Sequence, residues 1–214
     1  RLEVRWNQPI GDPTQLLATQ THDSPYWHPG RRALLQSLAF QKQLYAGLTG
    51  FSSASIEPFR HQLTIVRQIL HDPIPRYILA DEVGLGKTIE AGIVVRQHLL
   101  DEPNGFVIIA VPTHLIDQWS EELNSKFNLS TDFPEQFVIQ SHTSFSAPGG
   151  QKNIGTMLVV DEAHQVAATA YSANRSEQQI YRSLEVLASS TSHVLLLSGT
   201  PVLHNEASFL AMLH

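Results

Sequence analysis

A glycine-rich turn that ends in lysine and threonine lies between a short apolar run and a helix-forming segment. Its glycines let backbone N–H groups close around phosphate oxygens, and a helix that begins here adds its partial positive charge. Lys87 supplies a charge at the β and γ phosphates, and Thr88 is placed to bind magnesium. Taken alone, the pattern is also compatible with an ordinary glycine turn and a solvated lysine. The predicted nucleotide-binding residues are Asp81, Glu82, Val83, Gly84, Leu85, Gly86, Lys87 and Thr88.

Two adjacent carboxylates follow the apolar run Met157–Val160. Asp161 and Glu162 therefore come at the carboxyl end of a buried strand, where ligands of open α/β sheets bind. Asp161 is suited to hold magnesium, and Glu162 is suited to orient and deprotonate an attacking water. Phosphoryl transfer asks for such positioning and charge neutralisation, so Glu162 and Lys87 are the predicted catalytic residues. An Asp-Glu pair alone is equally typical of a helix N-terminus.

Small hydroxyl side chains follow a third apolar run, in the segment Ser198-Gly199-Thr200-Pro201. Ser198 and Thr200 are predicted to sense the γ phosphate, although an isolated Ser-Gly-Thr-Pro segment is more often a simple turn. The chain has 11 histidines, but none has the HExxH or cysteine-paired spacing of a zinc site. His164 is instead predicted to couple the acidic pair to Ser198 and Thr200.

The elements that position these residues alternate between apolar runs and amphipathic segments, which is typical of β-α units around a parallel sheet. The predicted strands are Tyr77–Ala80, Phe106–Val111, Phe137–Gln140, Met157–Val160 and Val194–Leu197. Apolar residues three or four apart predict helices at Pro58–Leu70, Lys87–Leu100, Thr113–Leu123 and Glu177–Ala188. Two polar stretches, Ser141–Thr156 and Ala167–Ser176, have no apolar period and are predicted to be surface loops.

The composition indicates a globular protein with a buried core: 214 residues with 42% hydrophobic side chains. The absence of cysteine and of long apolar runs leads us to expect a cytoplasmic protein with no membrane partner. The net charge of −6 is unusual for a nucleic-acid binder, which is typically basic. The first residue is Arg1 and the last residues continue an apolar helical pattern, so we expect a lobe truncated at its C-terminus.

Together, the loop, the Asp-Glu-Ala-His segment at 161–164 (a DEAH box) and the Ser-Gly-Thr-Pro segment resemble the Swi/Snf-like branch of superfamily-two helicases and translocases. The segment Leu79–Gly92, with Asp81 in the loop, is most similar to the bacterial RapA (HepA)-like branch. This resemblance implies an α/β fold: a RecA-like P-loop NTPase lobe whose parallel central sheet is flanked by helices on both faces. The resemblance covers Phe59–His214, and the lobe is expected to span residues 58–214. Residues 1–57 are expected to be a mostly helical extension of unknown function.

The resemblance also assigns residues outside the loop. Gln62 corresponds to the adenine-contacting glutamine, with Arg60 as a supporting residue. Pro112 and Thr113 fall in the motif that touches the backbone of the tracked nucleic-acid strand. Trp119 follows in the same segment, but its place on an apolar helical stripe predicts a core position.

The function implied is that of the first motor lobe of an ATP-dependent translocase on double-stranded DNA, with ATP and Mg²⁺ as cofactors. By the same resemblance, the ATP site of such motors is completed by a second RecA-like lobe. The chain alone is therefore expected to be inactive and to bind duplex DNA weakly. RNA polymerase or a larger protein complex are further expected partners. Two alternatives stay open: a nucleotide-gated protein-interaction module without motor activity, and a ring-forming P-loop ATPase.

Overall fold

The computed structural model describes residues 60–80, 86–146, 155–199 and 206–213. These residues lie within one compact unit that spans residues 48–214. The extension expected at residues 1–57, its helix and the boundary with the lobe lie outside the described residues. So do Asp81–Leu85 of the predicted phosphate loop and Thr200.

A five-stranded parallel sheet forms the centre of the described part, with strand order β1-β5-β4-β2-β3. The register is regular: Leu79 of β1 pairs with Leu197 of β5, and Val160 of β4 pairs with Leu196. Because all strands are parallel, their carboxyl ends meet at one edge. The strands are β1 Arg76–Leu79, β2 Val107–Val111, β3 Phe137–Ser141, β4 Met157–Val160 and β5 His193–Leu197.

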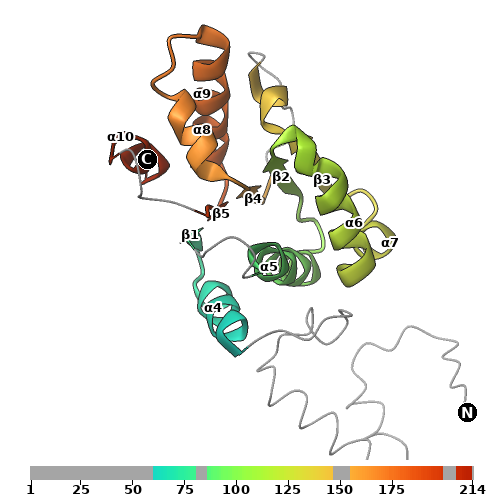
Figure 1. Cartoon of the computed structure of the whole chain (residues 1–214). Helices are drawn as coiled ribbons and strands as arrows, with labels where there is room; N and C mark the ends of the chain where they lie inside the picture. Colours follow the sequence, from blue (N-terminus) through green and yellow to red (C-terminus); the bar gives the residue numbers. More distant parts are fainter. Residues whose placement is uncertain (1–59, 81–85, 147–154, 200–205, 214) are drawn as a thin grey trace, which may run out of the picture. The chain divides into compact units, whose positions relative to one another are not determined.

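Helices cover both faces of this sheet (Figure 1). In the strand order, the connections from β1 to β2 and from β2 to β3 lead towards the outer strand β3. The connections from β3 to β4 and from β4 to β5 lead back towards the outer strand β1. Since crossovers between parallel strands are right-handed, the two directions place their helices on opposite faces. No helix among the described residues is long and apolar enough to cross a membrane. The fold predicted for residues 58–214 is confirmed in its described part.

The helices that follow the first two strands are α5 Lys87–Asp101 and α6 Ile116–Phe127, and α4 Arg60–His71 packs against α5. The opposite face carries α8 Ala163–Thr169, α9 Arg175–Ser190 and α10 Glu206–Leu213. Helix α8 contacts both α9 and α10. Three short elements complete the described chain: η1 Thr113–Leu115, α7 Leu129–Asp132 and η2 His142–Ser146.

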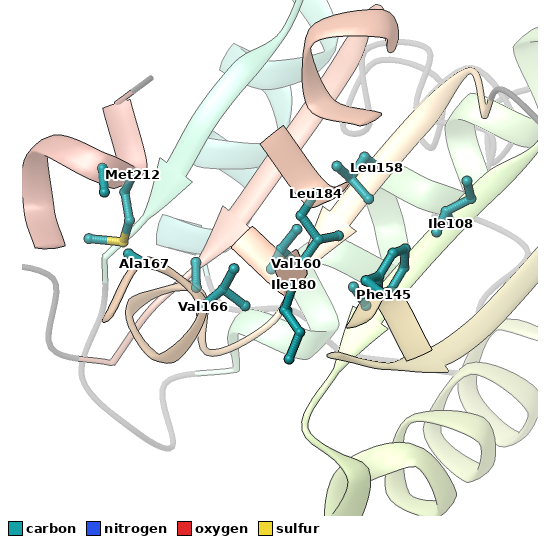
Figure 2. Packing of buried hydrophobic residues seen from close by; sticks show 12 residues of the cluster. Ile108, Phe145, Leu158, Val160, Val166, Ala167, Ile180, Leu184 and Met212 are labelled. Atoms are coloured by element: carbon teal, nitrogen blue, oxygen red, sulfur yellow. The ribbon is translucent and has the colours of Figure 1, made fainter. Parts of the chain in front are cut away.

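One large apolar cluster joins the sheet to the helices that follow β4 (Figure 2). Ile108, Leu158 and Val160 point from the central strands towards Ile180 and Leu184 of α9. Fully burying one such side chain contributes about 1.5–3 kcal/mol relative to leaving it exposed. This packing holds the acidic segment that follows β4 against a rigid support.

The structure corrects the prediction that two polar stretches are surface loops. Residues His142–Ser146 form the short helix η2, whose Phe145 is buried in the apolar cluster against α9. Ala167 is likewise buried, at the end of α8. A single aromatic or alanine side chain gives no periodic signal, so tertiary packing decided both positions.

Candidate nucleotide site

The candidate site lies where the strands end. Leu79, Val160 and Leu197 are the last residues of three strands that are adjacent in the sheet, β1, β4 and β5. The backbone N–H of Ser198 donates to the carbonyl of Leu79 at 3.0 Å, so the residue after β5 is fixed beside the end of β1. The fold therefore brings the acidic pair and Ser198 to one edge of the sheet, where α5 begins after β1.

The described end of the phosphate loop begins α5. Gly86 has φ +90°, a left-handed conformation that favours glycine, and its carbonyl accepts from the N–H groups of Ile89 and Glu90. Any Cβ at this position would also collide with the side-chain amide of Gln62. Lys87 and Thr88 follow as the first two helical residues, both half-buried. The backbone turn that begins α5 thus depends on glycine at position 86.

Gln62 reaches this turn from α4. Its side chain is only 3% exposed, and its amide nitrogen lies 3.5 Å from the carbonyl oxygen of Gly86. The structure thus places Gln62 beside the phosphate loop, and the predicted contact with adenine stays a prediction. Arg60 begins α4, but its side chain is outside the described residues.

Asp161 is held by two hydrogen bonds that fix both of its carboxylate oxygens. The indole N–H of Trp119 donates to Oδ2 at 2.8 Å, and the backbone N–H of Glu162 donates to Oδ1 at 2.8 Å. Trp119 is 1% exposed, which confirms its predicted place in the core, and Asp161 is 9% exposed. The contact between them was missed, although a buried indole N–H usually finds a partner and could have signalled it.

The acidic edge fits magnesium. A carboxylate has about four lone-pair sites, so Asp161 retains acceptor capacity after these two hydrogen bonds. The Thr88 hydroxyl belongs to the first turn of α5, which begins after β1 at the same edge of the sheet. Oxygen donors of these two kinds, completed by waters and phosphate oxygens, are those that Mg²⁺ prefers.

Glu162 has a strained backbone. Its φ of 48° and ψ of 45° lie in the left-handed region, which non-glycine residues rarely adopt. Strain of this kind costs about 1–3 kcal/mol and is concentrated at functional sites. Here it lets the chain leave β4 and begin α8 at Ala163 while the Glu162 side chain stays partly exposed.

His164 connects Glu162 to Ser198. Its Nδ1 atom lies 3.2 Å from a carboxylate oxygen of Glu162 and 3.1 Å from the hydroxyl oxygen of Ser198, which is fully buried. A carboxylate only accepts hydrogen bonds, so Nδ1 carries the proton in the contact with Glu162. The structure thus brings together three residues that the sequence assigned to catalysis and coupling, while their roles remain predictions.

Hydroxyl groups lie at the ends of β2 and β3, further along the same edge. The Thr113 hydroxyl is 2.6 Å from that of Ser141, which in turn is 2.9 Å from that of Thr143. Pro112 is buried, whereas Thr113 is exposed. An exposed hydroxyl with fixed orientation is suited to contact a phosphate group. The predicted nucleic-acid contacts of Pro112 and Thr113 stay predictions, and Ser141 was not singled out by the sequence.

His142 adds an uncharged ring to the interior behind this edge. Burial lowers the pKa of His142, and its Nε2 atom lies 3.3 Å from the carbonyl oxygen of Ala110. The negative charge of Asp161 acts in the opposite direction on this pKa, but burial has the larger effect. The imidazole is therefore kept neutral, and the anionic side chains of the site face no buried cation at this position.

Comparison with known proteins identifies the family. The family model of the SNF2-related domain matches residues 60–146. The RNA polymerase-associated protein RapA of Stutzerimonas stutzeri is 35% identical over 180 residues, which are 74% of this chain and 18% of that protein. RapA of Pseudomonas fluorescens is 34% identical over 196 residues, which are 80% of this chain and 20% of that protein. The chain thus spans about a fifth of the length of these relatives.

Solved structures agree on the fold. The Sulfolobus solfataricus SWI2/SNF2 ATPase core in complex with dsDNA matches with a TM-score of 0.60 at 16% identity, over 75% of this chain and 36% of that one. The UvsW helicase of bacteriophage T4 matches with a TM-score of 0.53 at 16% identity, over 73% of this chain and 57% of that one. The chain therefore belongs to the Snf2 family of superfamily-two helicases and translocases, in its RapA-like branch, and forms the first RecA-like lobe.

Proposed function

We propose that this lobe binds Mg-ATP and drives translocation on double-stranded DNA, with hydrolysis requiring a second RecA-like lobe. The observation that carries the proposal is the connected set Asp161, Glu162, His164 and Ser198. This set lies at the sheet edge where α5 begins with Lys87, so groups suited to phosphoryl transfer meet at one place.

The residues at this sheet edge have separate tasks that their surroundings favour. Lys87 and the N–H groups at the start of α5 bind the phosphates, while Glu162 orients a water for attack. Thr88 and Asp161 would hold Mg²⁺, which when bound neutralises charge on the phosphate oxygens. The indole of Trp119 keeps the Asp161 carboxylate in one orientation. Catalysis of this kind depends on such positioning.

Coupling is proposed to run through His164. The Nδ1 atom of His164 contacts both Glu162 and Ser198, and Ser198 is joined by its backbone to the end of β1. A change in phosphate occupancy that moves Glu162 would therefore shift the segment after β5. We propose that Ser198, with Thr200, reports the state of the γ phosphate to the rest of the motor.

The proposed track is duplex DNA, contacted through its backbone at Pro112 and Thr113. A net charge of −6 opposes binding of a polyanion, so the lobe alone is expected to bind DNA weakly and without sequence preference. A solved relative in fold is described in complex with dsDNA, and the RapA relatives are described as RNA polymerase-associated. These descriptions support DNA, and RNA polymerase or a larger assembly, as proposed partners.

The proposal is tested by comparing ATP turnover of this chain alone with that of the two-lobe protein, in which the chain is continued by its second RecA-like lobe. Arginines from a second lobe stabilise the transition state and contribute about 10³–10⁵ in rate. We therefore expect turnover near background for the chain alone and DNA-stimulated turnover for the two-lobe protein. Strong DNA-stimulated turnover by the chain alone would contradict the proposal that hydrolysis requires a second lobe. Nucleotide binding without turnover by the two-lobe protein would favour a nucleotide-gated interaction module.

Trp119→Phe gives a finer prediction. Phenylalanine keeps an aromatic ring in the core but cannot donate to Asp161, so the carboxylate loses one fixed orientation. Losing a hydrogen bond to a charged group costs about 1.5–3 kcal/mol, which corresponds to a loss of about tenfold or more in Mg²⁺-dependent nucleotide affinity. Affinity for the nucleotide without Mg²⁺ should hardly change. Binding is measured by fluorescence titration of a labelled ATP analogue at several Mg²⁺ concentrations.

The matched control for this variant is Phe127→Leu, because Phe127 is a large buried side chain on the same helix that cannot donate a hydrogen bond. It should lower the thermal stability without changing the ratio of Mg²⁺-dependent to Mg²⁺-independent affinity. Equal changes of that ratio in both variants would show that Trp119 acts only through packing.

A further inference from the structure

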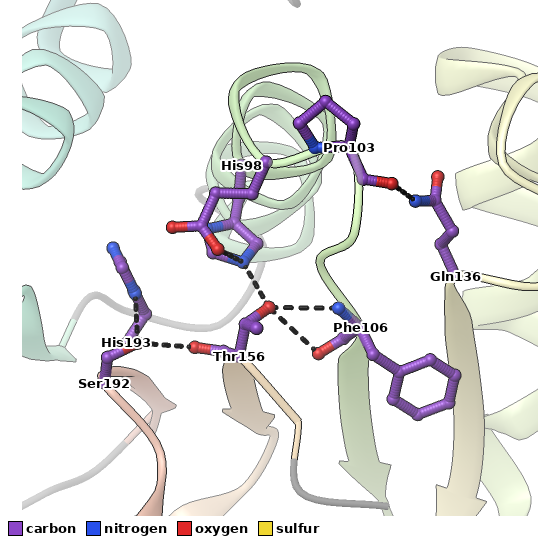
Figure 3. A network of polar contacts seen from close by, with 8 residues as sticks. His98, Pro103, Phe106, Gln136, Thr156, Ser192 and His193 are labelled. Carbon is purple, nitrogen blue, oxygen red and sulfur yellow. Dashed lines mark hydrogen bonds and ion pairs between the residues drawn. The ribbon is translucent and has the colours of Figure 1, made fainter.

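Two histidines, His98 and His193, lie at the opposite edge of the sheet, where the strands begin (Figure 3). A glutamate, Glu102, lies close to both. His98 and Glu102 are one turn apart at the end of α5, and His193 is the first residue of β5. Each offers one ligand atom, and these atoms lie within 4.8 Å of one another. The two imidazole rings have centroids 4.7 Å apart and an interplanar angle of 57°.

The distances are close to those that a single metal ion would impose. In tetrahedral coordination, two ligand atoms that each lie about 2.1 Å from a zinc ion are about 3.4 Å apart. The Nε2 atom of His98 and a carboxylate oxygen of Glu102 are 3.9 Å apart. The ligand atoms would have to move closer together to bind one ion, and the Glu102 side chain is 44% exposed and has room to move.

Neighbouring groups orient both rings. The Ser192 hydroxyl lies 2.8 Å from Nδ1 of His193, which fixes that ring and leaves Nε2 for a ligand. The Thr156 hydroxyl lies 2.7 Å from Nε2 of His98 and 3.3 Å from the carbonyl oxygen of Phe106. If Nε2 of His98 bound an ion, this hydroxyl could donate to Phe106 instead. An outer partner on the second ring nitrogen, as Ser192 is for His193, is typical of histidines that bind metals. The Thr156 hydroxyl contacts the proposed ligand atom of His98 itself, so an ion bound there replaces this contact.

The charge state of the pair also suits a cation. Burial lowers the pKa of His98, and the neighbouring His193 lowers it further. A neutral imidazole has the lone pair that a metal needs, whereas two protonated rings at this distance would repel each other. Glu102 and Asp101 place negative charge beside the rings.

We propose that His98, Glu102 and His193 form a binding site for a divalent transition-metal ion, separate from the nucleotide site. Two imidazoles and one carboxylate suit Zn²⁺, with a water completing four-coordination. The ion joins the end of α5 to the start of β5. The other end of α5 begins at the phosphate loop, and β5 leads to Ser198, so the site stabilises two elements that position the proposed nucleotide site.

The test is a calorimetric titration of the chelator-treated chain, without an affinity tag, with Zn²⁺ in the absence of nucleotide. We expect one site per chain at these residues and a loss of affinity of about tenfold or more in His193→Ala and Glu102→Gln, each of which removes one ligand. Zn²⁺ should also raise the midpoint of thermal unfolding of the unaltered chain, but not that of the two variants. Lowering the pH should weaken binding, because protons compete with the ion for the ligand nitrogen atoms.

His71→Ala is the matched control, since His71 is exposed at the end of α4 and its ring contacts the carbonyl of Arg67. This variant should bind Zn²⁺ as the unaltered chain does. Both His193 and Glu102 are partly exposed, so their replacement leaves the core intact, which far-UV circular dichroism verifies. Equal affinity in the unaltered chain and His193→Ala would overturn the proposal. Loss of binding in His164→Ala instead would place the ion at the acidic pair and overturn it as well.

Discussion

Glu162→Gln in the two-lobe protein is expected to lower ATP turnover by about 10²–10⁴, the usual contribution of a positioned general base. Glutamine has the same shape and can keep a contact with His164 through its amide oxygen, so the arrangement of α8 should persist. It cannot accept a proton from the attacking water. Turnover is measured as phosphate release at saturating ATP and DNA, and nucleotide affinity is measured separately.

Nucleotide affinity should change little in this variant, since Glu162 is assigned to the water and not to the phosphates. Glu121→Gln is the matched control, because Glu121 is an exposed residue on α6 and its replacement makes the same change of charge. It should retain full turnover. If Glu162→Gln also retained more than half of the turnover, the general base would have to be sought elsewhere at the sheet edge.

The sheet was the most predictable part of the molecule. Buried parallel strands are continuous apolar runs, so Met157–Val160 was predicted with its observed bounds and the other four strands differ by one residue at one or both ends. The helix Lys87–Leu100 ends one residue later than predicted. The predicted helix Thr113–Leu123 begins as η1 and continues as α6 to Phe127, which is the usual uncertainty at helix ends.

Elements fixed by single long-range contacts could not be predicted. The short helix η2 depends on Phe145 entering the core beside α9, and α7 has only four residues. Neither is long enough to show a hydrophobic period. The end of α8 lies in a segment that was predicted to be a loop because it is polar. Its polar residues gave no sign that Ala167 is buried.

The candidate site also has a part that could be predicted from the sequence and a part that could not. Residues that follow strands, such as Asp161 and Ser198, could be assigned to one edge because parallel topology dictates where strand ends meet. The partners of these residues depend on side-chain contacts across the fold. Trp119 is 42 residues from Asp161 in the chain, and His193 is far from His98. A linear search for metal-binding spacing therefore found no candidate among the histidines.

Lys87→Ala is expected to abolish ATP turnover by removing the charge that binds the β and γ phosphates. One charge-assisted hydrogen bond contributes about 1.5–3 kcal/mol, so nucleotide affinity should fall by about 10- to 100-fold. Turnover should fall further, because negative charge on the transferred phosphoryl group is stabilised less well in the transition state. Alanine favours helix, so α5 should still begin after Gly86 and the thermal stability should be maintained.

Lys126→Ala makes the same change of charge on α6, where Lys126 contacts Glu122 at 3.1 Å near the surface. Surface ion pairs contribute about 0–1 kcal/mol, so this control should retain nucleotide binding and turnover. Affinity is measured with a fluorescent ATP analogue, and turnover with the two-lobe protein. If both lysine variants lost affinity equally, general electrostatic attraction would explain the effect. A selective loss in Lys87→Ala would instead locate the phosphates at the start of α5, because only there does a helix N-terminus add its N–H groups to the lysine charge.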